Sequence, residues 1–209
     1  MKLFYFYLTF LISYLCYGDK KNQIEVIVFK NKDSLSKYAS DIFIKELKVS
    51  KKQKNKSLFF LPTGASPQKM YQRLVESHKQ KKVDLSDGKY FNLDEYVSLK
   101  EDDENSYQTY LRTNFFNHFL SDEEDENKLV SNLIPTSQNI KDAEKKVILH
   151  RANIDVSLSQ KNTRKICFAG LGSGPAHIAF NDFTDEVKTI PEEERNSFAV
   201  NSRLRVVPL

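Results

Sequence analysis

The chain has 209 residues, enough to fold around one sizeable α/β core. Hydrophobic residues make up 40% of the sequence and charged residues 29%, the values of an ordinary soluble globular protein. The formal net charge is +4, and both signs are spread along the chain, which argues against a nucleic-acid-binding protein.

The N-terminal stretch differs from the rest of the chain. Lys2 is followed by an uncharged, mostly apolar run from Leu3 to Gly18. A positive start, an apolar run and small residues at its end are typical of a secretory signal peptide. We therefore predict a signal peptide at 1–18 and a folded domain at 19–209, in a secreted or secretory-lumen protein. The run is shorter than the ~20 residues of a spanning helix, so no stable membrane span is expected, with an uncleaved signal anchor as the alternative.

Beyond this stretch, short apolar runs alternate with segments of helical period. Strands are expected at 24–29, 58–61, 89–96 and 165–170. Helices are expected from Asp33 or Ser34 to about Lys48, from Pro67 onward, at 107–119 and at 139–157. This alternation predicts an α/β fold with a parallel sheet.

The first candidate site follows the strand at 58–61. Thr63, Gly64, Ala65 and Ser66 form a loop of small residues before a helix, with Ser66 expected as the N-cap. Such a loop directs backbone N–H groups at an anion from the positive end of the helix dipole, which indicates phosphate binding. The Walker lysine is absent, which disfavours a nucleoside triphosphate, and a plain strand–helix turn is the alternative.

Two further strand ends carry candidate acid–base groups. Asp94 and Glu95 end the third strand, and because neighbouring strand residues point to opposite faces, only one of them can face a site. The last strand runs into the glycine-rich loop of Gly170, Gly172 and Gly174, which is followed by His177. A lone histidine is more often structural, as we expect for His78, His118 and His150. The three strand ends together indicate proton transfer on a phosphorylated small molecule.

Four motifs in the same order along the chain resemble the glucosamine-6-phosphate deaminase family. They are Leu-Pro-Thr-Gly-Ala-Ser-Pro, Phe-Asn-Leu-Asp-Glu-Tyr, Asn-Ser-Tyr with Asn-Phe-Phe-Asn-His, and His-Ile-Ala-Phe-Asn-Asp. The resemblance runs from about Ile24 to the C-terminus. It implies a Rossmann-like parallel sheet with helices on both faces, and conversion of glucosamine 6-phosphate to fructose 6-phosphate and ammonia without a metal or other cofactor.

The resemblance also implies roles for single residues. Asp94 corresponds to the base that moves a proton between C2 and C1 of the opened sugar. His177 corresponds to the group that opens the ring, and Asp182 stands where the family has a glutamate that orients this histidine. The loop of residues 63–66 corresponds to part of the phosphate cradle, and the glycines 170, 172 and 174 to the substrate loop.

The chain departs from the family pattern in two places. Pro175-Ala176 stand where the family has Asp-Gly, so a catalytic carboxylate is replaced. The family's chain also continues past the equivalent of Leu209, so we expect a domain truncated at its C-terminus, with an exposed sheet edge that favours a homo-oligomer. The family is cytosolic, whereas residues 1–18 predict secretion. A working deaminase, a secreted and catalytically dead relative that binds a phosphosugar or a partner, and a 6-phosphogluconolactonase-type hydrolase are the three hypotheses.

Overall fold

The structure is a computed structural model, and it describes residues 26–100, 102–120 and 132–170. The described elements are, in chain order, α1 (Lys32–Lys52), β1 (Ser57–Leu61), α2 (Gln68–Lys79), η1 (Leu85–Asp87), β2 (Gly88–Asn92), α3 (Tyr107–Asn114), η2 (Phe116–His118), α5 (Ile140–Ser159) and β3 (Arg164–Cys167). The predicted signal peptide at 1–18 lies outside these residues. No helix among the described elements is long and apolar enough to cross a membrane.

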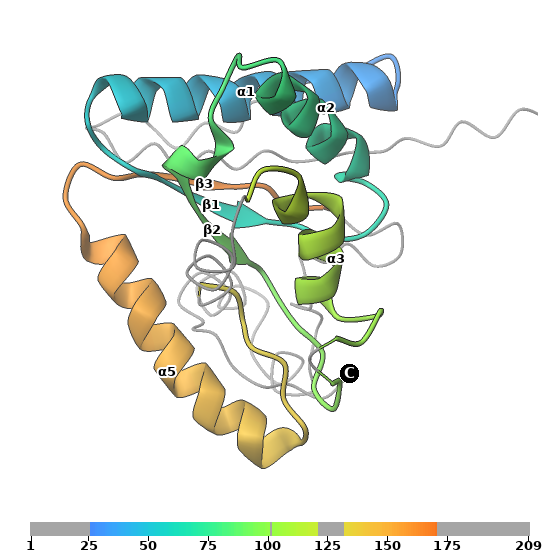
Figure 1. The fold of residues 1–209 in the computed structure, drawn as a ribbon, viewed down its shortest axis with the longest axis vertical. Helices are drawn as coiled ribbons and strands as arrows, with labels where there is room; N and C mark the ends of the chain where they lie inside the picture. The colour runs from blue at the N-terminus through green and yellow to red at the C-terminus, as the bar shows by residue number, and fades with distance from the viewer. Residues whose placement is uncertain (1–25, 101, 121–131, 171–209) are drawn as a thin grey trace, which may run out of the picture.

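The three strands form one parallel sheet in the order β2-β1-β3 (Figure 1). Ser57 of β1 is in register with Gly88 of β2 and with Arg164 of β3. Because all three strands run in the same direction, their carboxyl ends meet at one edge of the sheet. The backbone N–H of Phe168 extends this pairing by donating to the carbonyl of Phe60, at 3.0 Å. The prediction of a parallel α/β sheet is confirmed.

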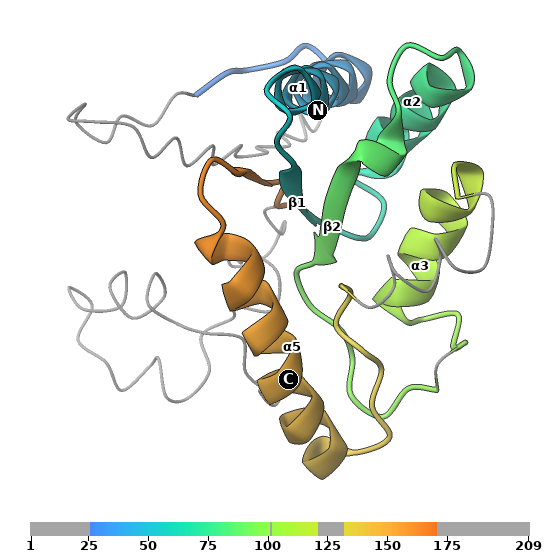
Figure 2. The ribbon, with the colours of Figure 1, turned by 60° about the vertical axis from the view of Figure 1, so that its left-hand side comes forward.

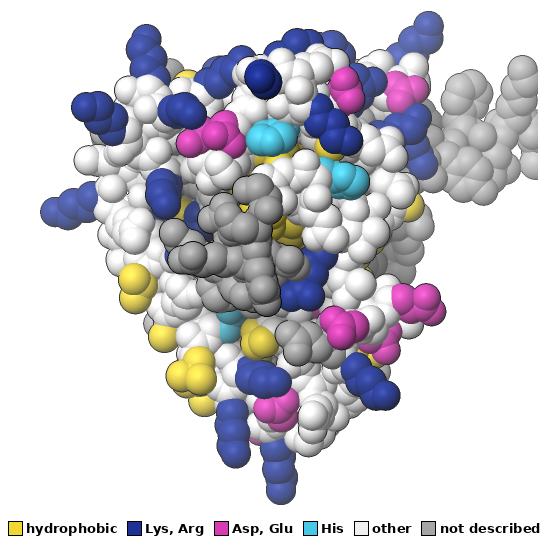
Figure 3. All heavy atoms as spheres, viewed as in Figure 1, with side chains coloured by type: hydrophobic (Ala, Val, Ile, Leu, Met, Phe, Trp, Pro, Cys, Tyr) yellow, Lys and Arg dark blue, Asp and Glu magenta, His cyan; other side chains and the backbone are white. Residues whose placement is uncertain are grey.

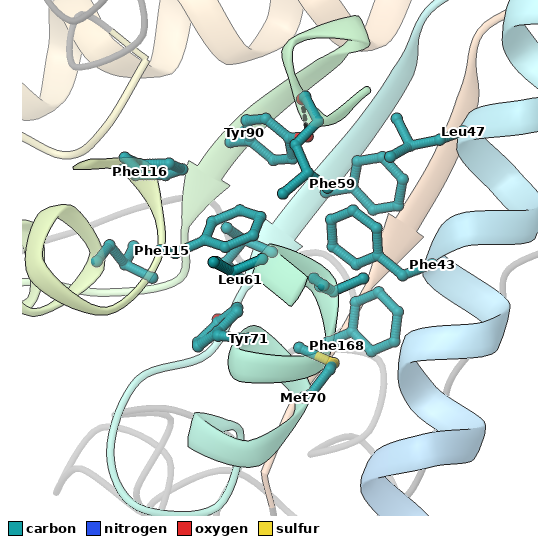
Figure 4. Close-up of a cluster of buried hydrophobic side chains, with 14 of the residues drawn as sticks. Phe43, Leu47, Phe59, Leu61, Met70, Tyr71, Tyr90, Phe115, Phe116 and Phe168 are labelled. Carbon is teal, nitrogen blue, oxygen red and sulfur yellow. Dashed lines mark hydrogen bonds between the residues drawn. The ribbon is translucent and has the colours of Figure 1, made fainter. Parts of the chain in front are cut away.

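One face of the sheet is covered by α1, α2 and α3 and holds the main core, which is rich in aromatic rings (Figure 4). The rings of Phe43 on α1 and Phe59 on β1 stack with centroids 3.9 Å apart. Tyr90 of β2 packs on Phe59, and Phe115 packs edge-on against Tyr90. These side chains are fully buried, so this face joins the sheet to three helices mainly through apolar contact, and Ser57 and Arg164 add polar links to α1.

The opposite face is covered by α5, which lies across the sheet from α1 and α2 in both ribbon views (Figure 2). The imidazole of His150 faces the ring of Phe91 edge-on, with centroids 6.4 Å apart. At the C-terminal end of the same helix, the Lys89 ammonium donates to the hydroxyl of Ser157, at 2.8 Å. Helices therefore cover both faces, as the family resemblance implies.

The strand expected at 24–29 is wrong for the part that the structure describes. Residues 26–30 have no regular secondary structure, and Val26 and Val28 are exposed. The described residues offer this segment no strand to pair with, and Phe29 packs instead on Tyr38 of α1. The run of valines and isoleucines thus predicted a strand, but residues 26–30 pair with no other strand among the described residues.

Several element ends differ from the prediction: α1 runs on to Lys52 instead of about Lys48, and β3 ends at Cys167 instead of residue 170. Helix α1 begins earlier, because Asn31 is its N-cap and accepts a hydrogen bond from the backbone N–H of Ser34. The helix expected at 107–119 is interrupted at Phe115, whose backbone (φ −138°, ψ −62°) is not helical. Phe115 and Phe116, at this break, are both fully buried.

Candidate functional site

The carboxyl edge of the sheet brings several predicted site residues together. The loop at 62–67 follows β1, Asp94 lies two residues beyond the end of β2, and Gly170 lies three residues beyond the end of β3. In open α/β sheets, ligands bind at this edge. Four predicted residues, Gly172, Gly174, His177 and Asp182, lie outside the described residues, so their place relative to this edge stays a prediction.

The predicted phosphate loop is an exposed turn. Gly64 has φ +88°, a backbone conformation that other residues adopt at a steric cost. Gly64, Ala65 and Ser66 are exposed and Thr63 is half-buried. Ser66 as N-cap is wrong: α2 begins at Gln68, and Pro67 occupies the cap position without a side-chain hydrogen bond. The turn places Ser66 outside the first helical turn, so its hydroxyl does not compete for the helix N–H groups.

Two tyrosines hold the backbone of this loop from the helices beside it. The Tyr71 hydroxyl, from α2, donates to the carbonyl of Pro62, at 2.5 Å. The Tyr110 hydroxyl, from α3, donates to the carbonyl of Gly64, at 2.6 Å. Burial raises the pKa of Tyr110 to about 12, so this donor keeps its proton at physiological pH. With its carbonyls engaged on one side, the loop keeps a defined shape for an anionic ligand.

The carboxylates of Asp94 and Glu95 have different surroundings, and that of Glu95 is a helix cap. Glu95 accepts hydrogen bonds from the Ser106 hydroxyl (2.9 Å) and from the backbone N–H groups of Tyr107 (3.0 Å) and Gln108 (2.8 Å). These groups are the first turn of α3, so Glu95 caps that helix at the positive end of its dipole. The expectation that only one of the pair serves a site is consistent with this use of Glu95.

Asp94 is half-buried just past β2, where the strand gives way to a tight connection. The side-chain amide of Asn92 donates to the carbonyl of Asp94, at 2.8 Å, and its oxygen accepts from the backbone of Ile134. Asn92 thereby ends the strand four residues before the predicted limit at Tyr96 and fixes the backbone that carries Asp94. A carboxylate held here, at the edge that carries the phosphate loop, can exchange a proton with a bound phosphorylated molecule.

A pair of tyrosines lies near Asp94. The hydroxyls of Tyr96 and Tyr107 are 3.3 Å apart, within hydrogen-bonding distance. Burial raises the pKa of Tyr107 well above its ordinary value, and the hydrogen bond to Tyr96 and the negative charges of Asp94 and Glu95 raise it further. These tyrosines and Tyr110 were not singled out from the sequence, although two of them belong to the Asp-Glu-Tyr and Asn-Ser-Tyr motifs.

The described residues contain no group of three or more His, Cys, Asp or Glu side chains that could hold a metal ion. Among the described residues, this edge carries a carboxylate, tyrosine hydroxyls and backbone N–H groups. Such groups can hold a phosphate and move a proton.

No family model matches the chain. It is similar to glucosamine-6-phosphate deaminase of Clostridium botulinum, at 32% identity over 183 residues, which are 86% of this chain and 67% of that protein. It is also similar to the deaminases of Phocaeicola vulgatus, at 32% identity over 76% of this chain and 56% of the relative, and of Borreliella burgdorferi, at 30% identity over 76% and 55%. The chain thus spans between about half and two thirds of the length of these relatives.

Two solved structures share the fold. One is a monomeric glucosamine-6-phosphate deaminase, with a TM-score of 0.51 and 24% identity, covering 62% of this chain and 49% of the other. The second is 6-phosphogluconolactonase from Trypanosoma cruzi, with a TM-score of 0.50 and 17% identity, covering 73% and 60%. At these identities the likeness shows the Rossmann-like α/β architecture and nothing of the reaction.

Proposed function

This chain belongs to the glucosamine-6-phosphate deaminase family, and on that premise we propose that it binds glucosamine 6-phosphate at the carboxyl edge of its sheet. The reaction that we propose is conversion of this sugar and water to fructose 6-phosphate and ammonia. The loop at 63–66 takes the phosphate through its backbone N–H groups. Asp94 moves a proton from C2 to C1 of the opened sugar, while His177, oriented by Asp182, opens the ring.

One observation supports this assignment above the others. Glu95 is engaged by the first turn of α3, and its neighbour Asp94 remains at the edge that carries the phosphate loop. Tyr110 spans the two parts, because it belongs to the helix that Glu95 caps and its hydroxyl holds the carbonyl of Gly64. The helix α3 thus connects the loop proposed to bind phosphate with the connection that carries the proposed base.

The test is ammonia release from glucosamine 6-phosphate by the full chain and by Asp94→Asn. General acid–base groups contribute about 10²–10⁴-fold, so kcat/KM of the variant is expected to fall by that factor while its thermal unfolding is unchanged. The matched control is Asp87→Asn, the same change at the opposite end of β2, where Asp87 pairs with Lys51 at 2.8 Å. Equal activity of Asp94→Asn and the unaltered chain would contradict the assignment.

A second candidate function is binding of the sugar phosphate without turnover. The observation that favours it is Pro175-Ala176, which replaces an aspartate and a glycine expected from the family motif. Under this candidate, calorimetry shows saturable binding and no ammonia appears. The double variant Pro175→Asp/Ala176→Gly is then expected to gain turnover. A double variant that binds the sugar phosphate but releases no ammonia would show that the missing carboxylate does not explain the lack of turnover.

The lactonase alternative is tested in the same preparations. Hydrolysis of 6-phosphogluconolactone that exceeds the spontaneous rate, without ammonia release from the amino sugar, would replace the deaminase proposal. Equal loss of both activities on Asp94→Asn would instead place both reactions at the same edge.

The location of the protein is a separate proposal that concerns residues 1–18. We propose that they direct the chain into the secretory pathway, because their positive start and uncharged apolar run are typical of signal peptides. The product secreted by a eukaryotic host is expected to begin near Asp19. A product that keeps Met1 and stays in the cytosol would contradict this.

A further inference from the structure

The helix α5 carries apolar side chains on the side that faces away from the sheet. Ile148, Leu149 and Val156 are 66%, 74% and 62% exposed, and Ala152 between them is exposed as well. We refer to these four residues as the outer α5 stripe. Figure 3 shows hydrophobic side chains gathered along the flank of the molecule that α5 forms, at the lower left.

The stripe lies away from the contacts that α5 makes with the rest of the fold. The buried residues of α5 are Ala143, His150 and Ser157, spaced seven apart and therefore on one side of the helix. At 100° per residue, Ile148 and Ala152 lie about 160° round the helix from His150, and Leu149 and Val156 lie about 100–120° from it on one flank of that side.

A surface helix ordinarily turns its apolar side chains toward the core. On α5 two of the three buried residues, His150 and Ser157, are polar, while Ile148, Leu149 and Val156 are exposed, so these apolar side chains have no partner among the described residues.

The charges that flank the stripe indicate what partner fits it. Exposed Lys145 lies on the N-terminal side of the stripe and exposed Asp155 near its C-terminal end. Their midpoint along the helix falls within the stripe. When two copies of α5 lie antiparallel about this midpoint, Lys145 of each copy lies opposite the partner's Asp155, and Ile148 lies opposite the partner's Ala152.

We propose that the outer α5 stripe binds a second copy of this chain, with the two α5 helices antiparallel across a two-fold axis. Such a contact is isologous, so each ion pair occurs twice and flanks one shared apolar centre. The small side chain of Ala152 lets the helices approach closely. A single helix pair buries less surface than standard interfaces of about 1,600 Å², so the dimer is a weak one, with a dissociation constant on the order of micromolar.

Sedimentation velocity of the full chain over a range of concentrations tests the proposal. A monomer–dimer equilibrium is expected. Leu149→Lys is expected to raise the dissociation constant at least tenfold, because it places a lysine of each copy in the apolar centre. The matched control is Val28→Lys, since Val28 is 75% exposed outside α5. A chain that stays monomeric at all concentrations, or a dimer that both variants weaken equally, would overturn the proposal.

Charge reversal separates antiparallel pairing from general hydrophobic association. Lys145→Glu and Asp155→Lys are each expected to weaken the dimer, because each places like charges opposite one another. The double variant Lys145→Glu/Asp155→Lys restores opposite charges and is expected to recover the dimer. Failure of the double variant to recover association, with its fold intact by circular dichroism, would overturn the antiparallel arrangement. If Leu149→Lys instead unfolds a monomeric chain, the stripe is covered by another part of the same chain and the proposal is wrong.

Discussion

The two faces of the sheet are built in different ways. The face covered by α1, α2 and α3 buries a continuous set of large side chains, among them Phe43, Phe59 and Tyr90, all fully buried. The face covered by α5 is joined by few contacts, and two of the three buried residues of α5, His150 and Ser157, are polar. The first face therefore carries most of the folding free energy, and on the second face polar side chains take a larger share of the contacts.

The physical reason lies in what each face removes from water. Burial of an aromatic side chain stabilises by about 1.5–3 kcal/mol and leaves no polar group unsatisfied. A buried histidine or serine stabilises only when its polar atoms are paired, and the Nε2 atom of His150 has no hydrogen-bond partner among the residues that the structure describes. The α5 face is thus the more sensitive one to conditions, although it contributes less to stability.

The largest expected effect is on the first face. Phe59→Ala removes a ring that stacks on Phe43 and packs on Tyr90, so we expect the free energy of unfolding to fall by about 3–5 kcal/mol. Denaturant unfolding of the dilute protein measures it. Leu149→Ala on the outer face of α5 is the matched control, expected to change stability by no more than about 0.5 kcal/mol. Equal losses would show that the two faces do not differ as described.

A smaller effect is expected from acid on the second face. Burial lowers the pKa of His150 from 6.5 to about 4. The unfolded chain therefore takes up a proton at a higher pH than the folded chain, and stability falls as the pH drops from about 6.5 to about 4, by up to about 3 kcal/mol. His150→Gln removes this contribution. The free energy of unfolding of both proteins, measured from pH 7 to pH 4, should converge or cross as the pH falls, and parallel curves would contradict the prediction.

The smallest effect is expected at the link between β2 and α5. Ser157 accepts a hydrogen bond from the Lys89 ammonium and donates one to the carbonyl of Asn153, both at 2.8 Å. Burial lowers the pKa of Lys89, so loss of its acceptor matters more than at an exposed site. Ser157→Ala is expected to cost about 1 kcal/mol in thermal unfolding. Ser159→Ala, an exposed serine on the same helix, is the control, and equal shifts in Tm would argue against the link.

Much of the fold could be predicted from local pattern. The apolar run at Leu58–Leu61 forms β1, and helices begin at Tyr107 and Ile140, at or within one residue of the expected starts at 107 and 139. The strand expected at 24–29 could not be excluded from the sequence, because a run of β-branched residues is a strand only when another strand pairs with it. The break at Phe115 was also not predicted, because the apolar period of the sequence continues through it to Phe119.

Part of the candidate site could likewise be predicted from the sequence, and part depends on tertiary contacts. The motifs placed Asp94 and the loop at 63–66 at strand ends, and the parallel sheet brings these ends to one edge. Strand alternation alone could not distinguish Asp94 from Glu95, and only the family resemblance assigned Asp94, because the groups that engage Glu95 lie 11 to 13 residues further along the chain. The contact between Tyr110 and Gly64, 46 residues apart, was equally invisible.

By itself, the sequence determined the class of the fold, the family and the order of the motifs, because these depend on residue type and on spacing along the chain. Only the tertiary structure decided which carboxylate caps α3, where β2 ends and which side of α5 stays exposed. Each of these is settled by contacts between residues that are distant in sequence. Such contacts form only when the helices are packed on the sheet, so the local sequence pattern does not predict them.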